Sequence, residues 1–244
     1  MPFYDREEKI INILFNHDTL RTTELAKQLY ISLPTLRRDL IKLEQKGIIR
    51  RSYGTVSLKT NSADEKIPFI LRQQEHNTEK NDIAQKASAH IKNGYTIMLD
   101  GSTSACALVP FLADFKHLIV ITSSAKTSFI LGEMGINNIC TGGHMINKSL
   151  SYVGYDAERT VANYNADVMF FSCRGISSEG WITDNSIEEN NLRQIMMKQS
   201  KKKILLCDSS KFNKTCLHNL CHIEELDDII SNVKIPDNIV NMLY

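Results

Sequence analysis

The sequence predicts an α/β protein of two domains: a small N-terminal domain of helices and a basic hairpin, and a larger domain with a parallel sheet. Residues 1–60 hold 11 Lys and Arg against 7 Asp and Glu, whereas the remainder, with 18 against 21, is mildly acidic. In the remainder, strand-like apolar runs alternate with helix-like stretches, as in a parallel sheet covered on both faces. We predict domains at 1–58 and 75–244, joined by a linker at 59–74 that begins with the polar segment KTNSADEK.

The N-terminal domain begins with two predicted helices. Residues 5–17 repeat apolar side chains at helical spacing. The next helix is short and runs to Tyr30. Thr22 or Thr23 can cap it, because a side-chain hydroxyl accepts a hydrogen bond from an otherwise unpaired amide of the first turn.

A third helix follows the tight connection ISLPT at 31–35. Ser32 can cap it, and Pro34 is tolerated in the first turn because the amide that proline lacks would be unpaired there. A stripe of leucines marks the inward face of this helix, and Gly47 ends it.

A basic hairpin completes this domain. Two short strand-like runs, IIRRS and TVSL, flank a turn at Tyr53 and Gly54. Helices followed by such a hairpin are typical of a winged helix-turn-helix, which presents side chains of one helix to base edges and neutralises phosphates with Arg and Lys. The alternative is a helical bundle for protein contacts with solvated charges, but the cluster TLRRDL favours DNA. The expected DNA-facing residues are Ser32, Pro34, Thr35, Arg37, Arg38, Lys42, Arg50, Arg51 and Tyr53.

The segment TTELAKQLYISLPTLRRDLIKLEQKGIIRRSYG resembles the DNA-binding signature of the DeoR family of bacterial transcription regulators. The resemblance covers nearly all of residues 5–58. It implies a winged helix-turn-helix that binds an operator in double-stranded DNA.

In the larger domain, apolar strands alternate with helices. Strand-like runs lie at 95–100, 117–124, 137–143, 166–173, 202–210 and 227–231, and helix-like stretches at 78–91, 105–115 (with a proline inside), 125–135, 155–164 and 186–200. Ligands of such sheets bind beyond the carboxyl ends of the strands. Five successive strand ends carry small, hydroxyl or glycine residues: 100–104, 122–124, 141–143, 172–175 and 208–211. Each alone is ordinary turn chemistry, but their convergence predicts an anion site.

Three charged residues of this domain are ambiguous on sequence alone. Lys211 can supply a point charge for a phosphate or be a solvated surface lysine. Arg174 can clamp a phosphate with two hydrogen bonds or form a salt bridge between subunits. Glu189 lies on an amphipathic helix, where it can accept hydrogen bonds from sugar hydroxyls or merely face solvent.

Residues 75–232 resemble the effector domain of the DeoR family, which is similar in fold to ribose-phosphate isomerase. The matching segments are EKNDIAQKA, LDGSTS, TSS, GG, EE and LLCDSSKF, in this order. The resemblance implies that a phosphorylated sugar or sugar derivative binds at these loops. The expected effector-binding residues are Asp100, Gly101, Ser102, Thr103, Ser104, Thr122, Ser123, Gly142, Gly143, Arg174, Gly175, Glu189 and Lys211.

The sequence shows no targeting signal, which predicts an intracellular protein. The start MPFYDREEKIINILF has charges where a signal peptide needs an apolar core, and no apolar run approaches the roughly 20 residues of a membrane helix. We expect a cytoplasmic protein with reduced cysteines. The segment CLHNLCH at 216–222 lacks the second ligand pair that a zinc site needs, so we predict a helix with buried cysteines and no metal.

Two functional hypotheses follow. The first is a transcriptional repressor of a carbohydrate-utilisation operon, without catalytic residues or cofactor, that releases its operator when a sugar phosphate binds. A palindromic operator needs two heads, so we expect a homodimer or homotetramer. The second is a sugar-phosphate isomerase with a fused DNA-binding head, in which Asp100, Glu188, Glu189 or Asp208 would serve as the base. A nucleotide-binding module is a weaker third possibility, because the chain has no GxGxxG or Walker loop.

Overall fold

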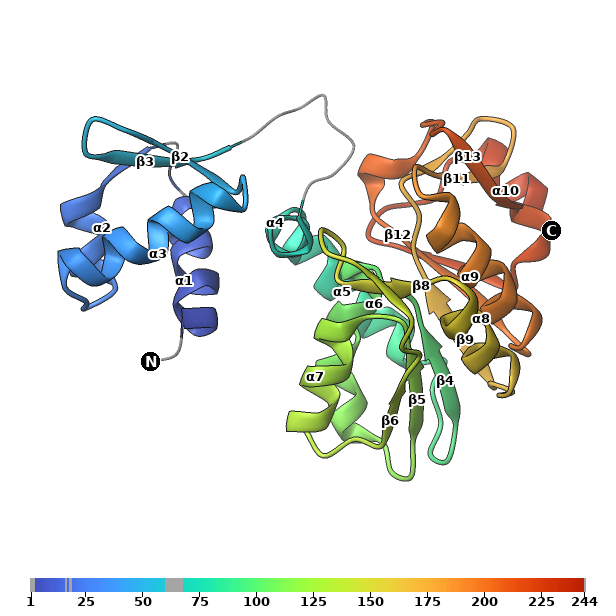
Figure 1. The fold of residues 1–244 in the computed structure, drawn as a ribbon. Helices are drawn as coiled ribbons and strands as arrows, with labels where there is room; N and C mark the ends of the chain where they lie inside the picture. Colours follow the sequence, from blue (N-terminus) through green and yellow to red (C-terminus); the bar gives the residue numbers. More distant parts are fainter. Residues whose placement is uncertain (1–2, 16, 18, 60–67, 244) are drawn as a thin grey trace. The chain divides into compact units, whose positions relative to one another are not determined.

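The computed structural model describes residues 3–15, 17, 19–59 and 68–243, and the chain divides into two compact units between Glu75 and His76 (Figure 1). Of the expected linker, residues 60–67 lie outside the described residues. Its end is helix α4 (Phe69–Gln74), which packs against α1 of the N-terminal unit and buries Leu71 in the core of that unit. No helix among the described residues is long and apolar enough to span a membrane.

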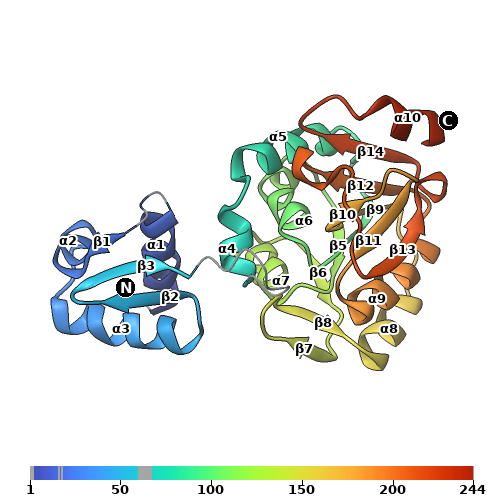
Figure 2. The ribbon, with the colours of Figure 1, turned by 90° about the horizontal axis from the view of Figure 1, so that it is seen from above.

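The N-terminal unit is a winged helix-turn-helix, as predicted. Its wing is an antiparallel three-stranded sheet in the order β1-β3-β2, and three helices pack beside it (Figures 1 and 2). Before α4, its elements are α1 (Phe3–Phe15), β1 (Leu20–Arg21), α2 (Thr22–Gln28), α3 (Leu33–Gln45), β2 (Ile49–Ser52) and β3 (Thr55–Leu58).

The leucine stripe of α3 holds this unit together. Leu36, Leu40 and Leu43 are completely buried in one apolar cluster with side chains of α1 and α2. Asp39, the last residue of the RRD sequence, is also buried, and its Oδ2 accepts a hydrogen bond of 2.7 Å from Nε of Arg6. The acidic residue of this motif therefore fixes α1 to α3 and leaves the two arginines before it on the outer surface.

The predicted limits of the second helix are wrong at both ends. Neither threonine caps α2; its N-cap is Arg21, and the Thr22 hydroxyl donates to the carbonyl of Gly54 at the tip of the wing (3.1 Å). The helix ends at Gln28, and Tyr30 adopts a left-handed conformation with φ of 53°. The Thr22 hydroxyl thus binds the wing turn, whereas the local sequence predicts that it caps α2.

The C-terminal unit contains the predicted parallel sheet. Six strands lie in the order β14-β12-β9-β4-β5-β6, and every neighbouring pair is parallel. The strands are β4 (Thr96–Leu99), β5 (Ile119–Thr122), β6 (Asn138–Cys140), β9 (Val168–Phe171), β12 (Lys203–Cys207) and β14 (Asp228–Ser231).

Helices cover both faces of this sheet, as Figure 2 shows. On one face, alternate residues such as Leu99 and Phe170 pack against α5, α6 and α7; on the other, Met98 and Phe171 pack against α8 and α9. The helices are α5 (Asn77–Ser88), α6 (Thr103–Ala107), α7 (Ala125–Glu133), α8 (Tyr155–Ala162) and α9 (Ile187–Lys198).

Two sequence predictions for this unit are wrong. The stretch at 105–115 is not one helix, because α6 stops before Pro110 and a 3-10 helix, η1 (Val109–Asp114), continues. The CLHNLCH segment is not a helix but contains strand β13 (His218–His222), which pairs with β11 (Trp181–Asp184). Among the described residues, no group of His, Cys, Asp and Glu side chains could hold a metal ion.

Several elements have no counterpart in the sequence prediction. A hairpin of β7 (His144–Ile146) and β8 (Ser151–Val153) follows β6, and β10 (Gly175–Ile176) joins β11 and β13 in a small antiparallel sheet. Helix α10 (Asp237–Leu243) follows β14. These elements are short, two to seven residues, so periodicity could not reveal them.

Candidate functional site

The first candidate site is the outer face of α3. The helix begins as predicted: the Ser32 hydroxyl accepts from the amide of Thr35 (3.3 Å), and Pro34 lies in the first turn. Arg37, Arg38 and Lys42 are exposed. Neither Arg37 nor Arg38 forms an ion pair with any described residue, so both guanidinium groups are available for a polyanion.

The wing supplies the other expected contacts. Arg50 is exposed and forms no ion pair with a described residue, whereas Nε of Arg51 donates to the Glu44 carboxylate (2.9 Å). This hydrogen bond lowers the pKa of Glu44 and fixes the end of α3 to the wing. Tyr53 at the wing turn is fully exposed, with φ of 42°. The nine predicted residues thus lie on one helix with its cap and on the adjoining hairpin.

The second candidate site is the carboxyl edge of the parallel sheet. The five polar segments follow β4, β5, β6, β9 and β12, and the carboxyl ends of parallel strands meet at one edge. Several of their hydroxyls are already used locally. Ser102 caps α6 by accepting from the amide of Ala105 (3.1 Å), and Thr122 accepts from the amide of Ser124 (3.1 Å).

Asp100 directly follows β4, but its carboxylate is fully engaged. Oδ1 accepts from the amide of Ser102 (3.1 Å), and Oδ2 accepts from the amide of Ser172 (3.4 Å) and from Nε of Arg193 (2.9 Å). The side chain is 1% exposed. Asp100 therefore holds the loop after β4 in place, rather than presenting a free carboxylate.

Arg193 on α9, which the sequence analysis did not single out, is at the centre of this arrangement. Its Nη1 donates to Asp184 at the end of β11 (3.0 Å) and to Oδ1 of Asn190 (3.1 Å). Burial lowers the pKa of Arg193, but Asp184 and Asp100 raise it by more, so the guanidinium stays charged. The same ion pair keeps the pKa of Asp184 below its usual value against the effect of burial.

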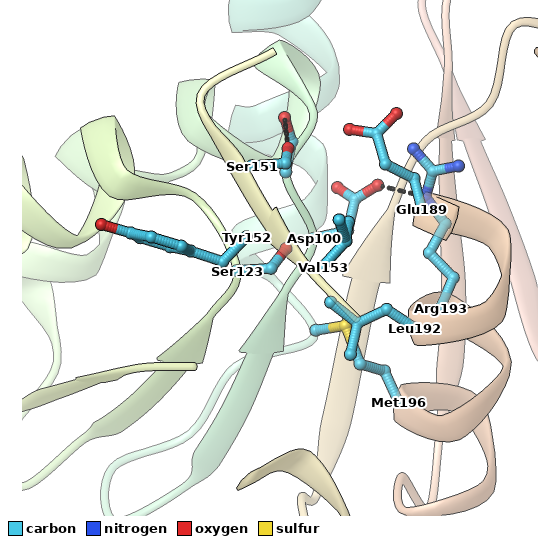
Figure 3. Close-up of a pocket in the computed structure, with 10 residues that line it drawn as sticks. Asp100, Ser123, Ser151, Tyr152, Val153, Glu189, Leu192, Arg193 and Met196 are labelled. Atoms are coloured by element: carbon cyan, nitrogen blue, oxygen red, sulfur yellow. Dashed lines mark hydrogen bonds and ion pairs between the residues drawn. The ribbon is translucent and has the colours of Figure 1, made fainter. Parts of the chain in front are cut away.

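A pocket opens beside this cluster, between α9, strand β8 and the ends of β4 and β5 (Figure 3). The predicted residues among its walls are Asp100, Gly101, Ser123 and Glu189. The Glu189 carboxylate makes no hydrogen bond or ion pair with a described residue, in contrast to Asp100. The other lining residues are Ser151, Tyr152, Val153, Leu192, Arg193 and Met196.

The glycines allow the β7–β8 hairpin to approach the strand ends. A Cβ atom at Gly101 would lie 1.9 Å from Oγ of Ser151. At Gly143, where φ is +102°, a Cβ atom would lie 2.7 Å from the carbonyl oxygen of Val153. Both positions therefore require glycine for packing, whatever else they bind.

Lys211 and Arg174 both have protein partners. Nζ of Lys211 donates to the Ser172 hydroxyl (2.7 Å) and lies 3.3 Å from Asp208. Burial lowers the pKa of Lys211, but Asp208 together with Cys173 and Cys207 raises it by more. The net pKa lies above its usual value, so this lysine remains a cation. Arg174 lies 3.6 Å from Asp184 and is about one-third exposed. Lys211 is thus not the solvated surface lysine of the alternative interpretation.

The pocket brings together only part of the predicted set. The remaining predicted residues of this unit lie at the same sheet edge but not in the pocket wall: Ser102, Thr103, Ser104, Thr122, Gly142, Gly143, Arg174, Gly175 and Lys211. One sequence signal could have found Arg193, since it lies four residues after Glu189 and so on the same helix face. The hairpin residues carry no comparable signal.

Comparisons with known proteins match each of the two units separately; below, the N-terminal unit (residues 1–75) is called the head and the C-terminal unit (residues 76–244) the sensor. The family model of the DeoR-like helix-turn-helix domain matches residues 6–62, and that of the DeoR C-terminal sensor domain matches residues 75–233. The L-fucose operon activator of Escherichia coli (strain K12) is 33% identical over 93% of this chain and 94% of the activator.

The lactose phosphotransferase system repressor of Staphylococcus epidermidis is 30% identical over 95% of this chain and 93% of the repressor. Among solved structures, a ribose 5-phosphate isomerase A from Methanocaldococcus jannaschii has 14% identity and a TM-score of 0.43, over 56% of this chain and 55% of that chain. Family models match both units and the relatives are named as regulators, so the alternative of an isomerase is not supported. The chain belongs to the DeoR family and is a DNA-binding transcription regulator, not an enzyme.

Proposed function

We propose that this protein represses a carbohydrate-utilisation operon and releases its operator when a phosphorylated sugar binds at the carboxyl edge of the sensor sheet. The observation that carries the proposal is the pocket at this edge, where the free carboxylate of Glu189 lies beside Arg193. Carboxylate and guanidinium groups together match the donors and acceptors of a sugar hydroxyl. Lys211 adds a half-buried cation at the same sheet edge, and its ammonium group can act as a point charge for a phosphate.

The head supports binding to an operator through two kinds of contact. Arg37 and Arg38 on α3 are exposed, as contact with base edges in the major groove requires, and Arg50 on the wing is exposed, as contact with the phosphate backbone requires. A palindromic operator would require two such domains to act together, so the proposed function includes a homodimer or homotetramer.

The relatives support a sugar operon as the target, since one is named for L-fucose and another for lactose. One of them is an activator and the other a repressor, and both directions of control obey the same linkage. An effector that binds one arrangement of the heads more tightly shifts the population toward that arrangement.

A combined DNA and ligand experiment tests this function. A duplex is selected from randomised DNA with the full-length protein, and its affinity is measured with and without a panel of sugar monophosphates. We expect at least one of them to raise the melting temperature of the protein and to weaken DNA binding. The proposal is wrong if no sugar monophosphate does either, or if only unphosphorylated sugars do.

Two variants relate the response to the proposed site. In Lys211→Met, we expect the response to sugar phosphates to be lost while DNA affinity without ligand is kept. Lys198→Met removes an exposed lysine of α9 and serves as the matched control. A full response in Lys211→Met would exclude Lys211 from phosphate binding.

A further inference from the structure

The charges around Arg193 favour an uncharged group of the ligand, such as a hydroxyl, in this part of the sensor pocket. Three carboxylates, Asp100, Asp184 and Glu189, surround this guanidinium, and Arg174 adds one more positive charge 3.6 Å from Asp184. Negative charge therefore exceeds positive charge here. A phosphate would be repelled, whereas a hydroxyl can donate to a carboxylate and accept from a guanidinium.

Arg193 is held too firmly to move aside for a ligand. Its side chain is 7% exposed, and Nε and Nη1 are committed to Asp100, Asp184 and Asn190. Nη2 makes no hydrogen bond to a described residue, so one nitrogen of a fixed guanidinium remains available as a donor. Such preorganisation lowers the cost of binding because nothing has to be ordered when the ligand arrives.

Glu189 lies one helical turn before Arg193 on α9, and Figure 3 shows its carboxylate beside the guanidinium at the pocket. Its carboxylate has no hydrogen-bond partner among the described residues, and the side chain is half-buried. Leu192, Met196 and Val153 line the pocket as well and provide an apolar wall. A sugar has hydroxyls at its edge and C–H groups on its face, which is the chemistry that these two kinds of wall would contact.

We propose that Glu189 and Arg193 form a subsite for the hydroxyl-bearing end of the effector, and that the phosphate binds outside this subsite. Nη2 of Arg193 donates to one ligand oxygen, and Glu189 accepts from a ligand hydroxyl. This inference rests on the proposed function, because it concerns which part of a phosphorylated sugar the pocket recognises.

The substitution Glu189→Gln tests the inference by the sign of its effect. The probes are D-ribose 5-phosphate, D-fructose 1-phosphate, D-fructose 6-phosphate and D-glucose 6-phosphate, titrated calorimetrically into the full-length protein. For each probe that binds the wild type, we expect affinity to fall about tenfold, because a charged acceptor of a hydroxyl is lost. If Glu189 faced the phosphate instead, removal of its negative charge would strengthen binding.

Two further variants separate recognition from folding. Arg193→Lys keeps the charge but cannot bridge Asp100 and Asp184 while still donating to a ligand, so we expect weaker binding again. Its far-UV circular dichroism shows whether the fold survives, and if it does not, Glu189→Gln still decides the matter. Lys198→Met on the exposed side of α9 is the matched control and should bind as the wild type does.

The outcomes distinguish this inference from the proposed function. Unchanged or tighter binding of sugar monophosphates in Glu189→Gln overturns the subsite and leaves the proposed function standing. Failure of every sugar monophosphate to bind the wild type overturns both. Weaker binding in Glu189→Gln, with Lys198→Met unchanged, supports the assignment of the hydroxyl end to this subsite.

Discussion

The two units use charged residues in opposite ways. In the head, Arg37, Arg38 and Arg50 are exposed and have no ionic partner among the described residues. In the sensor, Arg193 is buried and Lys211 is half-buried, and both are bound to carboxylates. An exposed, unpaired arginine costs the fold little and can meet a polyanion, whereas a buried charge must be paired before any ligand arrives. Charge in the sensor therefore contributes first to structure, and only the atoms left over can recognise a ligand.

The largest expected effect tests the structural role of buried charge. Replacement of Asp100 by alanine should lower the free energy of unfolding of the sensor by about 3–5 kcal/mol, because Arg193 loses a buried partner and two amides lose their acceptor. Urea denaturation followed by circular dichroism measures the change. Asp100→Asn keeps an acceptor of the same shape and should cost less. Equal stability of Asp100→Ala and wild type would contradict this account of the cluster.

The next effect tests the exposed charges of the head. Arg38→Ala should weaken binding to a selected duplex by about 1–3 kcal/mol and reduce the salt dependence of binding by about one counterion. The melting temperature should stay unchanged, because Arg38 is exposed and forms no ion pair with any residue that the structure describes. Fluorescence anisotropy at several salt concentrations provides both numbers. Loss of stability in place of loss of affinity would show that Arg38 is structural.

A smaller effect is expected at the start of the recognition helix. Ser32→Ala removes the N-cap of α3 and should cost about 1 kcal/mol of stability. Ser32→Asp restores an acceptor for the Thr35 amide and should recover the stability. It should not recover DNA affinity, since a negative charge would then face the phosphates. Thermal unfolding and anisotropy together separate these two consequences.

The smallest expected difference lies between two neighbouring arginines of the wing. Arg51 must give up its hydrogen bonds to Glu44 before it can contact a phosphate, whereas Arg50 forms no ion pair in the described part of the chain. Arg51→Ala should therefore reduce DNA affinity less than Arg50→Ala, by up to about 1 kcal/mol. Glu44→Gln frees Arg51 and should remove the difference. Equal losses of DNA affinity in the two variants with Glu44 intact would mean that the ion pair between Arg51 and Glu44 does not affect DNA binding.

Much of the architecture was predictable because its signals are local. The leucine stripe of α3, its Ser32 cap and the alternation of strands and helices are periodic or positional patterns, and the structure confirms them. The errors have local causes as well. The Thr22 hydroxyl donates to the wing turn and does not cap its own helix. The segment at 216–222 contains a strand because it pairs with β11.

The sequence by itself determined the fold class, the alternation of the six parallel strands with helices, and the sheet edge at which polar loops gather, since these depend on periodicity and on the direction of parallel strands. Only the tertiary structure decided which polar side chains remain available. Asp100 and Glu189 are both carboxylates at the same pocket, yet the first is saturated by contacts with residues 72 and 93 positions away. Partners so distant in the chain leave no trace in local sequence, and they determine whether a charge holds the fold together or binds a ligand.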